Sequence, residues 1–153
     1  MTDVLRDDGV WVDDAAGSAA PALDGFLVDA AAQSVRLAPT DDASALAPHV
    51  GRLRLVAIEF PIFSDGRGYS IATLLRRRHG YEGEMLAVGD VLIDQLFMLR
   101  RVGFTRFAVR ADQDRDRAVR ALSTYSDVYQ GAFDEPLPAY RRRVRPTATE
   151  RAA

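Results

Sequence analysis

The feature that most constrains the fold is an alternation of short apolar runs with helical patterns between residues 53 and 131. The runs LRLVAIEF, EMLAVG and TRFAVR have the length and the apolar, β-branched composition of strands. The first run is apolar on both of its faces, which is typical of a parallel sheet covered by helices. The alternation therefore predicts an α/β fold, in which repeated βα units form a mainly parallel sheet flanked by helices.

A helix is predicted after each of these strands. Residues 71–80 place apolar side chains and the stem of Arg78 on one helical face. The segment DVLIDQLFMLRRVG predicts a second helix, with Asp90 as its cap. The segment DRDRAVRALSTYSDVYQGA predicts a third amphipathic helix that ends at Gly131.

The two ends of the chain are less regular. GVWVDD and GFLVDA look like short strands separated by an Ala/Gly/Pro-rich loop, SVRLAPTDD predicts a strand and a helix cap, and DASALAPHVGRL predicts a short helix. After Phe133 the sequence has no core pattern and predicts a disordered tail. We therefore expect a single domain over residues 1–133, with a weakly patterned N-terminal β segment over 1–40, and a tail over 134–153.

Composition excludes several classes of protein. No apolar run approaches the roughly 20 residues of a membrane helix, and the acidic N-terminus lacks a secretory signal, so we expect a cytoplasmic protein with no membrane partner. The absence of cysteine removes disulfides and thiol chemistry, and His49 and His79 have no ligand cluster at metal spacing. The net charge of −2 argues against a nucleic-acid partner, and we expect the arginines of the tail motif RRRVR to be solvated.

In open α/β sheets, ligands collect at the carboxyl ends of the parallel strands. The loops that follow the three predicted strands carry charged residues that would converge if the strands are neighbours. We call this edge of the sheet the strand-end rim. Its charged residues are Asp65, Arg67, Asp90, Arg110 and Asp112.

The loop that precedes the first helix is the main candidate for ligand binding. Gly66 and Gly68 would let backbone N–H groups approach an anion, and Arg67 would add a bidentate contact. The alternative is a capped turn, in which Asp65 or Ser70 caps the helix and Arg67 is solvated. The predicted ligand-binding residues are Asp65, Gly66, Arg67, Gly68, Tyr69, Ser70, Asp90, Asp94 and Gln95.

Asp90 and Asp94 are four residues apart in the predicted second helix, where they would form a carboxylate pair on one face. The alternative is structural. One carboxylate would cap the helix, the other would favour its positive pole, and Gln95 would bond a neighbouring loop.

Two catalytic motifs match only in part. GRGYSI resembles the dinucleotide fingerprint, with Asp90 at about the expected distance, but Ile71 replaces the third glycine and five residues separate the strand from Gly66. GYSIA approaches a nucleophile elbow around Ser70, but the only later histidine, His79, lies near the helix end. The residues therefore assign neither a catalytic group nor a cofactor.

The block from residue 55 to 110 carries the motifs F-P-x-F-x-D-G-R-x-Y-S, L-L-R-x-R, G-Y-x-G-E, A-V-G-D-V-L-x-D-Q-L and R-x-G-F in this order. This block closely resembles a family of small bacterial proteins of unknown function. Members are commonly encoded beside sulfite reductase and are described as oxidoreductases of sulfite reduction. The resemblance implies a role in assimilatory sulfur metabolism.

Two hypotheses about function follow. The first is a non-catalytic accessory of sulfite reduction that binds sulfite reductase, its cofactor supply or a small anionic ligand at the strand-end rim. The missing cysteines favour it, because no side chain of this protein supplies a redox centre. The second, based on the partial fingerprint, is a small oxidoreductase that uses a bound nucleotide or flavin.

Overall fold

In the computed structural model, which describes residues 3–142, the centre of the molecule is a six-stranded sheet with strand order β2-β1-β6-β5-β4-β3. The strands are β1 (Asp3–Arg6), β2 (Trp11–Asp13), β3 (Ser34–Leu37), β4 (Leu55–Phe60), β5 (Glu84–Val91) and β6 (Arg106–Val109). Strands β3 to β6 run parallel, and β1 and β2 form an antiparallel hairpin at the edge of β6. The predicted α/β fold with a mainly parallel sheet is confirmed.

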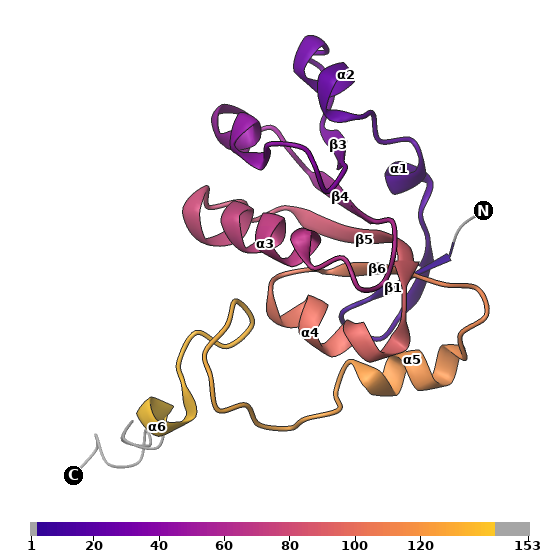
Figure 1. Cartoon of the computed structure of the whole chain (residues 1–153), viewed down its shortest axis with the longest axis vertical. Helices are drawn as coiled ribbons and strands as arrows, with labels where there is room; N and C mark the ends of the chain where they lie inside the picture. The colour runs from indigo at the N-terminus through magenta and orange to yellow at the C-terminus, as the bar shows by residue number, and fades with distance from the viewer. Residues whose placement is uncertain (1–2, 143–153) are drawn as a thin grey trace.

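Most helices pack on one face of this sheet (Figure 1). The helical elements are α1 (Ala15–Ser18), α2 (Leu23–Val28), the 3-10 helix η1 (Ala43–His49), α3 (Arg67–Thr73), the π-helix η2 (Leu74–Arg78), the 3-10 helix η3 (Ile93–Gln95), α4 (Leu96–Arg101), α5 (Arg115–Ala121) and α6 (Ala139–Arg142). Val56, Ile58 and Phe60 of β4 point to this face, where they pack with buried residues of η1, α3, α4 and α5. The main core therefore lies on one side of the sheet.

The opposite face of the sheet is only half covered. Short α1 lies on this side (Figure 1), where Leu55, Ala57 and Leu86 form a second, smaller cluster with Val4. Nearer to the carboxyl ends of the strands, Val88 is only partly buried. Parallel sheets are usually covered on both faces. The uncovered half, which we call the open face, is therefore the unusual feature of this fold.

The parallel strands follow one another in space in the same order as in the sequence, from β3 to β6. Each connection therefore moves one strand further in the same direction. A topological switch point, where nucleotides bind in doubly wound folds, requires this direction to reverse. Strands β3 to β6 contain no such reversal.

Three predicted elements differ from the structure. GFLVDA forms helix α2 and not a strand, with Phe26 buried and Val28 exposed. The helix predicted from Asp90 begins later, because β5 continues to Val91 and Leu92 takes the N-cap position of η3. The third predicted helix is shorter than expected, since α5 ends at Ala121.

The helix after β4 widens into a π turn, in which the N–H of His79 donates to the carbonyl oxygen of Leu74 at 3.2 Å. Within this turn Arg76 is buried and Arg78 is exposed. The sequence pattern placed Arg78 on the apolar face of this helix, but the buried arginine in the structure is Arg76. A regular 3.6-residue period, which the sequence pattern assumes, does not hold in a π turn.

Part of the segment expected to be a disordered tail is ordered. Over residues 134–142 the chain packs back on the domain, and α6 contributes a buried Ala139. Residues 143–153, which include the end of the RRRVR motif, lie outside the described residues. No helix within residues 3–142 is long and apolar enough to cross a membrane.

Candidate functional site

The first loop of the strand-end rim connects β4 to α3 and spans residues 61–66, which we call the rim loop. At its end, the Asp65 carboxylate accepts a hydrogen bond from the backbone N–H of Arg67 at 3.1 Å. The Arg67 guanidinium also donates to Asp65, through Nε at 3.0 Å and Nη2 at 2.7 Å. These hydrogen bonds hold the pKa of Asp65 below its ordinary value. Arg67 is thus paired within its own turn, whereas the capped-turn alternative expected a solvated Arg67.

The glycines of this segment do not form an anion-binding loop with unusual backbone angles. Gly66 has a φ of −77°, which any residue adopts. Gly68 is buried against β4, and a Cβ at this position would lie 2.5 Å from Cζ of Phe60. Gly68 therefore allows close packing of α3 on the sheet. The third glycine has this role in a dinucleotide fingerprint.

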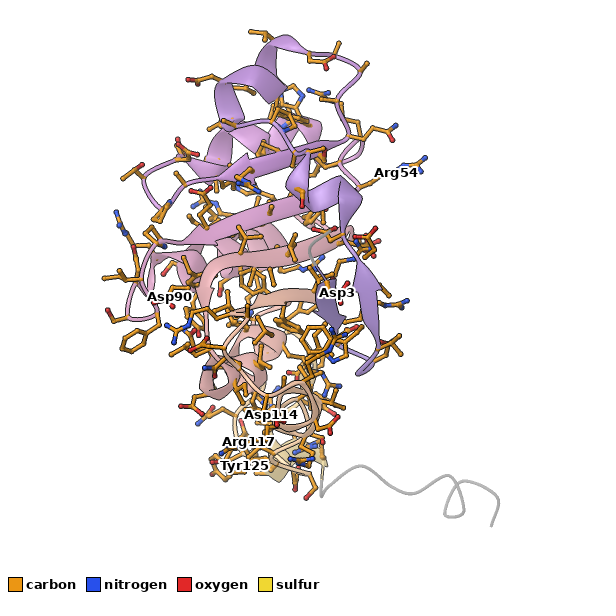
Figure 2. The ribbon with its side chains drawn as sticks, turned by 90° about the vertical axis from the view of Figure 1, so that its right-hand side faces the viewer. Asp3, Arg54, Asp90, Asp114, Arg117 and Tyr125 are labelled. Atoms are coloured by element: carbon orange, nitrogen blue, oxygen red, sulfur yellow. The ribbon has the colours of Figure 1, made fainter. Side chains whose placement is uncertain are left out.

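A bulge in β5 places the second rim residue. Gly89 has a φ of +98°, and a Cβ there would lie 2.4 Å from the carbonyl oxygen of Phe60. The register between β5 and β6 shifts at this point. Bulges of this kind change the direction in which a neighbouring side chain points. Here the neighbour is Asp90, at the carboxyl end of the sheet and on the opposite side from Arg54 in Figure 2.

Asp90 connects the rim loop to β6. Its Oδ2 accepts the backbone N–H of Phe63 at 2.9 Å, and its Oδ1 accepts Nη1 of Arg110 at 2.8 Å. The hydrogen bond from Arg110 and then that from Phe63 lower the pKa of Asp90. Arg110 also binds Asp112 through two contacts of 2.7 Å, which lower the pKa of Asp112 to about 2. Of the five charged rim residues, Asp90, Arg110 and Asp112 are therefore in contact, whereas Asp65 and Arg67 pair with each other.

Gln95 holds the rim loop from the other side. Its Nε2 donates to the carbonyl oxygen of Phe63 at 2.7 Å, while its Oε1 accepts the N–H of Leu92 at 3.0 Å. The expected carboxylate pair is not formed on a helical face, because Asp90 belongs to β5 and the exposed Asp94 to η3.

The two remaining predicted residues lie on α3. Tyr69 is half-buried edge-on against Phe60, with ring centroids 5.7 Å apart, and this burial raises the pKa of its hydroxyl. Ser70 is exposed on the same helix. Neither side chain joins the Asp90–Arg110 contacts.

The rim loop presents two apolar side chains to solvent. Ile62 is 57% exposed and Phe63 is 54% exposed. Both backbone polar groups of Phe63 are bonded, to Asp90 and to Gln95. The sequence places Ile62 and Phe63 in the loop after the first strand, but neither was among the predicted ligand-binding residues. Pro61, which ends the strand before them, was the signal that they lie outside the sheet.

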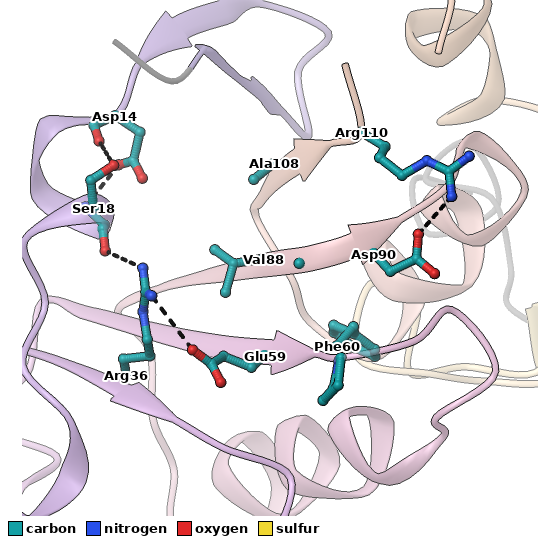
Figure 3. A pocket seen from close by; sticks show the side chains of 12 residues that line it. Asp14, Ser18, Arg36, Glu59, Phe60, Val88, Asp90, Ala108 and Arg110 are labelled. Carbon is teal, nitrogen blue, oxygen red and sulfur yellow. Dashed lines mark hydrogen bonds and ion pairs between the residues drawn. The ribbon is translucent and has the colours of Figure 1, made fainter. Parts of the chain in front are cut away.

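A pocket of about 640 Å³ lies beside the rim loop on the open face. Figure 3 shows Val88 and Ala108 on its floor, Arg36 and Glu59 at one side, and Arg110 at the other. The pocket is formed by β3 to β6 and by α1, which closes the side nearest Arg36. It therefore lies over the carboxyl-end half of the sheet, next to α1.

Arg36 is incompletely satisfied in this pocket. Its Nη1 lies 3.4 Å from Oε1 of Glu59, and its Nη2 lies 3.4 Å from the carbonyl oxygen of Gly17. Its Nε is buried and forms no hydrogen bond with the described residues. Arg36 and Glu59 were not among the predicted site residues. The sequence signal for them was that each interrupts an otherwise apolar strand, at positions that face the same side of the sheet.

The described residues contain no group of three or more His, Asp or Glu side chains that is able to hold a metal ion. His49 packs edge-on against Phe26 at 5.7 Å between ring centroids, which is a structural contact.

Residues 34–140 match the family model described as a bacterial protein of unknown function, DUF934. The chain is a member of this family. The match begins at β3 and ends within α6, so it contains the whole strand-end rim of the DUF934 protein. The hairpin of β1 and β2, together with α1 and α2, precedes the matched residues. Neither curated proteins nor solved structures match the chain.

The charged side chains at the rim of this DUF934 protein are paired with one another. Asp65 and Asp90 are each hydrogen-bonded to an arginine, so neither is a free base, and both arginines already have a carboxylate partner. The rim loop also exposes two apolar side chains, those of Ile62 and Phe63. Hydrogen bonds with Asp90 and Gln95 hold the backbone of Phe63.

Proposed function

We propose that this DUF934 protein is a non-catalytic accessory of assimilatory sulfite reduction, and that it binds sulfite reductase through the rim loop. The pathway is supported by the motifs of residues 55–110 and their resemblance to proteins encoded beside that enzyme. The mode of binding is supported by one observation, the fixed and exposed pair Ile62 and Phe63.

The physical reason is preorganisation. Large apolar side chains near the centre of an interface supply most of its binding free energy. A loop that is already ordered loses little conformational entropy when it binds. Phe63 meets both conditions, since side chains from β5 and η3 hold its backbone. A free anion at the rim would instead have to displace a carboxylate from Arg67 or Arg110.

The test is a pull-down of sulfite reductase by the tagged protein from cells grown on sulfate. We expect the Phe63→Ala variant to weaken the association by at least about 2 kcal/mol, roughly 30-fold, as at other interface hot spots. The matched control is Val28→Ala on α2, which removes an apolar side chain that is 87% exposed and outside the rim. We expect this control to bind like the unmodified protein.

Two results would count against the proposal in different ways. If sulfite reductase does not associate and deletion causes no growth defect on sulfate, the pathway is wrong. If the reductase associates equally with the Phe63→Ala variant, the pathway stands but the rim loop is not the binding surface.

The open-face pocket favours a second candidate function, a small oxidoreductase with a bound nucleotide or flavin. Its volume of about 640 Å³ falls within the usual range for organic ligands, ~300–1,000 Å³. The strand order argues against a dinucleotide, because β3 to β6 lack a switch point. Thermal-shift measurements with nicotinamide and flavin nucleotides test this candidate. A ligand at 100 times its dissociation constant should stabilise the fold by about 2.7 kcal/mol, and the absence of any shift would exclude it.

A further inference from the structure

A second, smaller cavity lies between η2, the end of α4 and residues 131–133, and its lining shares no residue with the rim. Its volume is about 230 Å³, below the usual range for organic ligands. Three arginines line it, Arg76, Arg77 and Arg101, and no carboxylate is among its described lining residues. The cavity is therefore positively charged and of a size for a small ion.

The charge of Arg76 is buried without a carboxylate partner in the described chain. Its guanidinium donates to the carbonyl oxygens of Gly103 at 2.6 and 3.0 Å, Tyr81 at 2.7 Å and Gly83 at 2.8 Å. It also lies 4.8 Å from the ring centroid of Phe133. Carbonyl dipoles satisfy the N–H groups, but they do not neutralise the charge.

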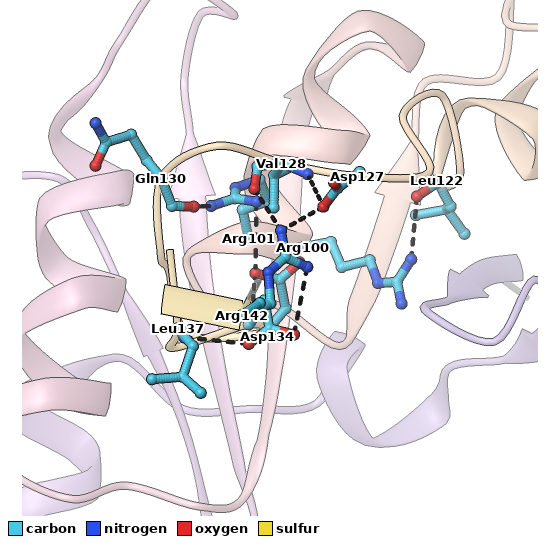
Figure 4. A network of polar contacts seen from close by, with 10 residues as sticks. Arg100, Arg101, Leu122, Asp127, Val128, Gln130, Asp134, Leu137 and Arg142 are labelled. Carbon is cyan, nitrogen blue, oxygen red and sulfur yellow. Dashed lines mark hydrogen bonds and ion pairs between the residues drawn. The ribbon is translucent and has the colours of Figure 1, made fainter. Parts of the chain in front are cut away.

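Arg101, which also lines the cavity, has a long ion pair with Asp134 but an unsatisfied N–H group. The residue is only 6% exposed, and its Nη2 donates to the carbonyl oxygen of Gln130 (Figure 4). Its Nη1 is buried and forms no hydrogen bond with the described residues. The nearest carboxylate oxygen is that of Asp134, 4.0 Å away. A buried donor without a partner is rare in folded proteins, and its presence indicates a missing acceptor.

Arg77 supplies a third charge at the mouth of the cavity. It is exposed and forms no ion pair or hydrogen bond with residues 3–142. Arg76 and Arg77 are consecutive residues of the π turn η2, and both line the cavity. Turns of this type are rare and often occur at functional sites.

We propose that this cavity binds a small, doubly charged oxyanion such as sulfate, sulfite or phosphate. The planar guanidinium fork suits the oxygens of such ions. The exposed Arg77 donates hydrogen bonds directly, the unsatisfied Nη1 of Arg101 gains an acceptor, and Arg76 gains charge compensation that residues 3–142 do not provide. This inference does not depend on the proposed function.

The experiment is calorimetric titration of the full-length protein with sodium sulfate, sulfite and phosphate, against sodium chloride at equal ionic strength. We expect saturable binding of at least one oxyanion and none of chloride. The oxyanion that binds most tightly shows which of the three ions the cavity prefers. In parallel, the amide NMR signals of Val102, Gly131 and Ala132 should shift during the titration, because these residues line the cavity.

The decisive comparison is between two neighbouring exposed arginines. Arg77→Gln should weaken oxyanion binding about tenfold, as expected for loss of one hydrogen bond from a charged donor. Arg78→Gln removes the same charge from a residue that does not line the cavity, and it should leave the affinity unchanged. Both substitutions are on the surface, so both variants should fold.

Equal weakening by the two substitutions would overturn the proposal, because it would indicate general attraction to a basic surface. The absence of saturable binding by all three oxyanions would also overturn it. So would amide shifts confined to residues outside the cavity.

Discussion

At the scale of single residues, the segment GRG at the start of α3 contains two glycines with different roles. Gly68 lies so close to Phe60 that no side chain fits between them without movement. Gly66 has open space around the position of a Cβ and an ordinary helical φ. The close contact of Gly68 explains why this glycine spacing occurs without a full dinucleotide fingerprint.

Gly68→Ala should destabilise the protein by about 1–3 kcal/mol, the usual effect of overpacking a core. Gly66→Ala should be neutral or stabilise the fold by up to about 1 kcal/mol, since it reduces the freedom of the unfolded chain. Urea unfolding followed by circular dichroism measures both. Equal effects of the two substitutions would show that the contact with Phe60 does not restrict the size of the side chain at position 68.

The contact between Asp90 and Phe63 should depend on pH. Because the pKa of Asp90 is lowered in the folded protein, the contact is fully present above the ordinary value of 3.8 and is lost as the pH falls further. The amide NMR shift of Phe63 should therefore titrate below pH 3.8. Arg110→Gln should move this midpoint upward, towards 3.8, because Arg110 is the main cause of the shift. Arg67→Gln should not move it, since Arg67 pairs with Asp65.

The sequence identified most charged residues of the rim, but not their partners. Asp65, Asp90 and Arg110 were predictable because they follow apolar strands. That Asp90 would bond the backbone of Phe63 depended on the bulge at Gly89, and an apolar run does not reveal a bulge. Arg36 was missed for a similar reason. Its environment depends on how far α1 covers the sheet, which is decided by tertiary packing.

At the scale of elements, the π turn η2 decides which arginine is buried. Arg76 occupies the buried position and bonds three backbone carbonyls that link η2 to the loops before β5 and β6. Burial lowers the pKa of its guanidinium. The helix is thus connected to two neighbouring segments by one side chain.

Arg76→Met keeps most of the side-chain volume but leaves these carbonyls without donors. We expect it to destabilise the fold by about 3 kcal/mol or more, because hydrogen bonds from charged groups contribute about 1.5–3 kcal/mol each. Arg78→Met, on the exposed side of the same turn, should change stability by less than about 0.5 kcal/mol. Urea unfolding in chloride buffer compares them. Similar small effects would mean that water replaces Arg76 at these carbonyls.

Elements with a strong local pattern were predictable, and those defined by tertiary contacts were not. Strands β4, β5 and β6 were predictable, because each contains a continuous apolar run. GFLVDA has a mixed apolar pattern that suits a strand or a helix, and only Phe26 of α2 is buried. Strand β1 was not predicted, because DVLR is short and is ordered by pairing with β2 and β6.

At the scale of the whole molecule, the N-terminal hairpin completes a sheet whose other strands belong to the family match. Strand β1 lies between β2 and β6, and its Leu5 is fully buried in the main core. Residues before Ser34 therefore share the core of the matched segment. A single domain over residues 1–133 stays a prediction.

If the hairpin and the matched segment form one domain, they should unfold together. Trp11 in β2 is the single tryptophan of the chain, so its fluorescence reports on the hairpin, while circular dichroism reports on the whole fold. We expect coincident urea transitions. Leu5→Ala should lower both midpoints, with a loss of about 2–5 kcal/mol. Val10→Ala, at an exposed position of the hairpin, should not. Separate transitions would show that the hairpin is an independent unit.

The pairing of β1 with β6 also has a consequence for how the sheet is assembled. Leu5 pairs with Phe107, so β1 is synthesised long before its inner neighbour β6. Contacts between residues so distant in sequence close late and slow the folding of a domain. Until β6 emerges from the ribosome, β1 lacks the inner strand with which it pairs in the sheet, so Val4 and Leu5 are more open to solvent and to chaperones.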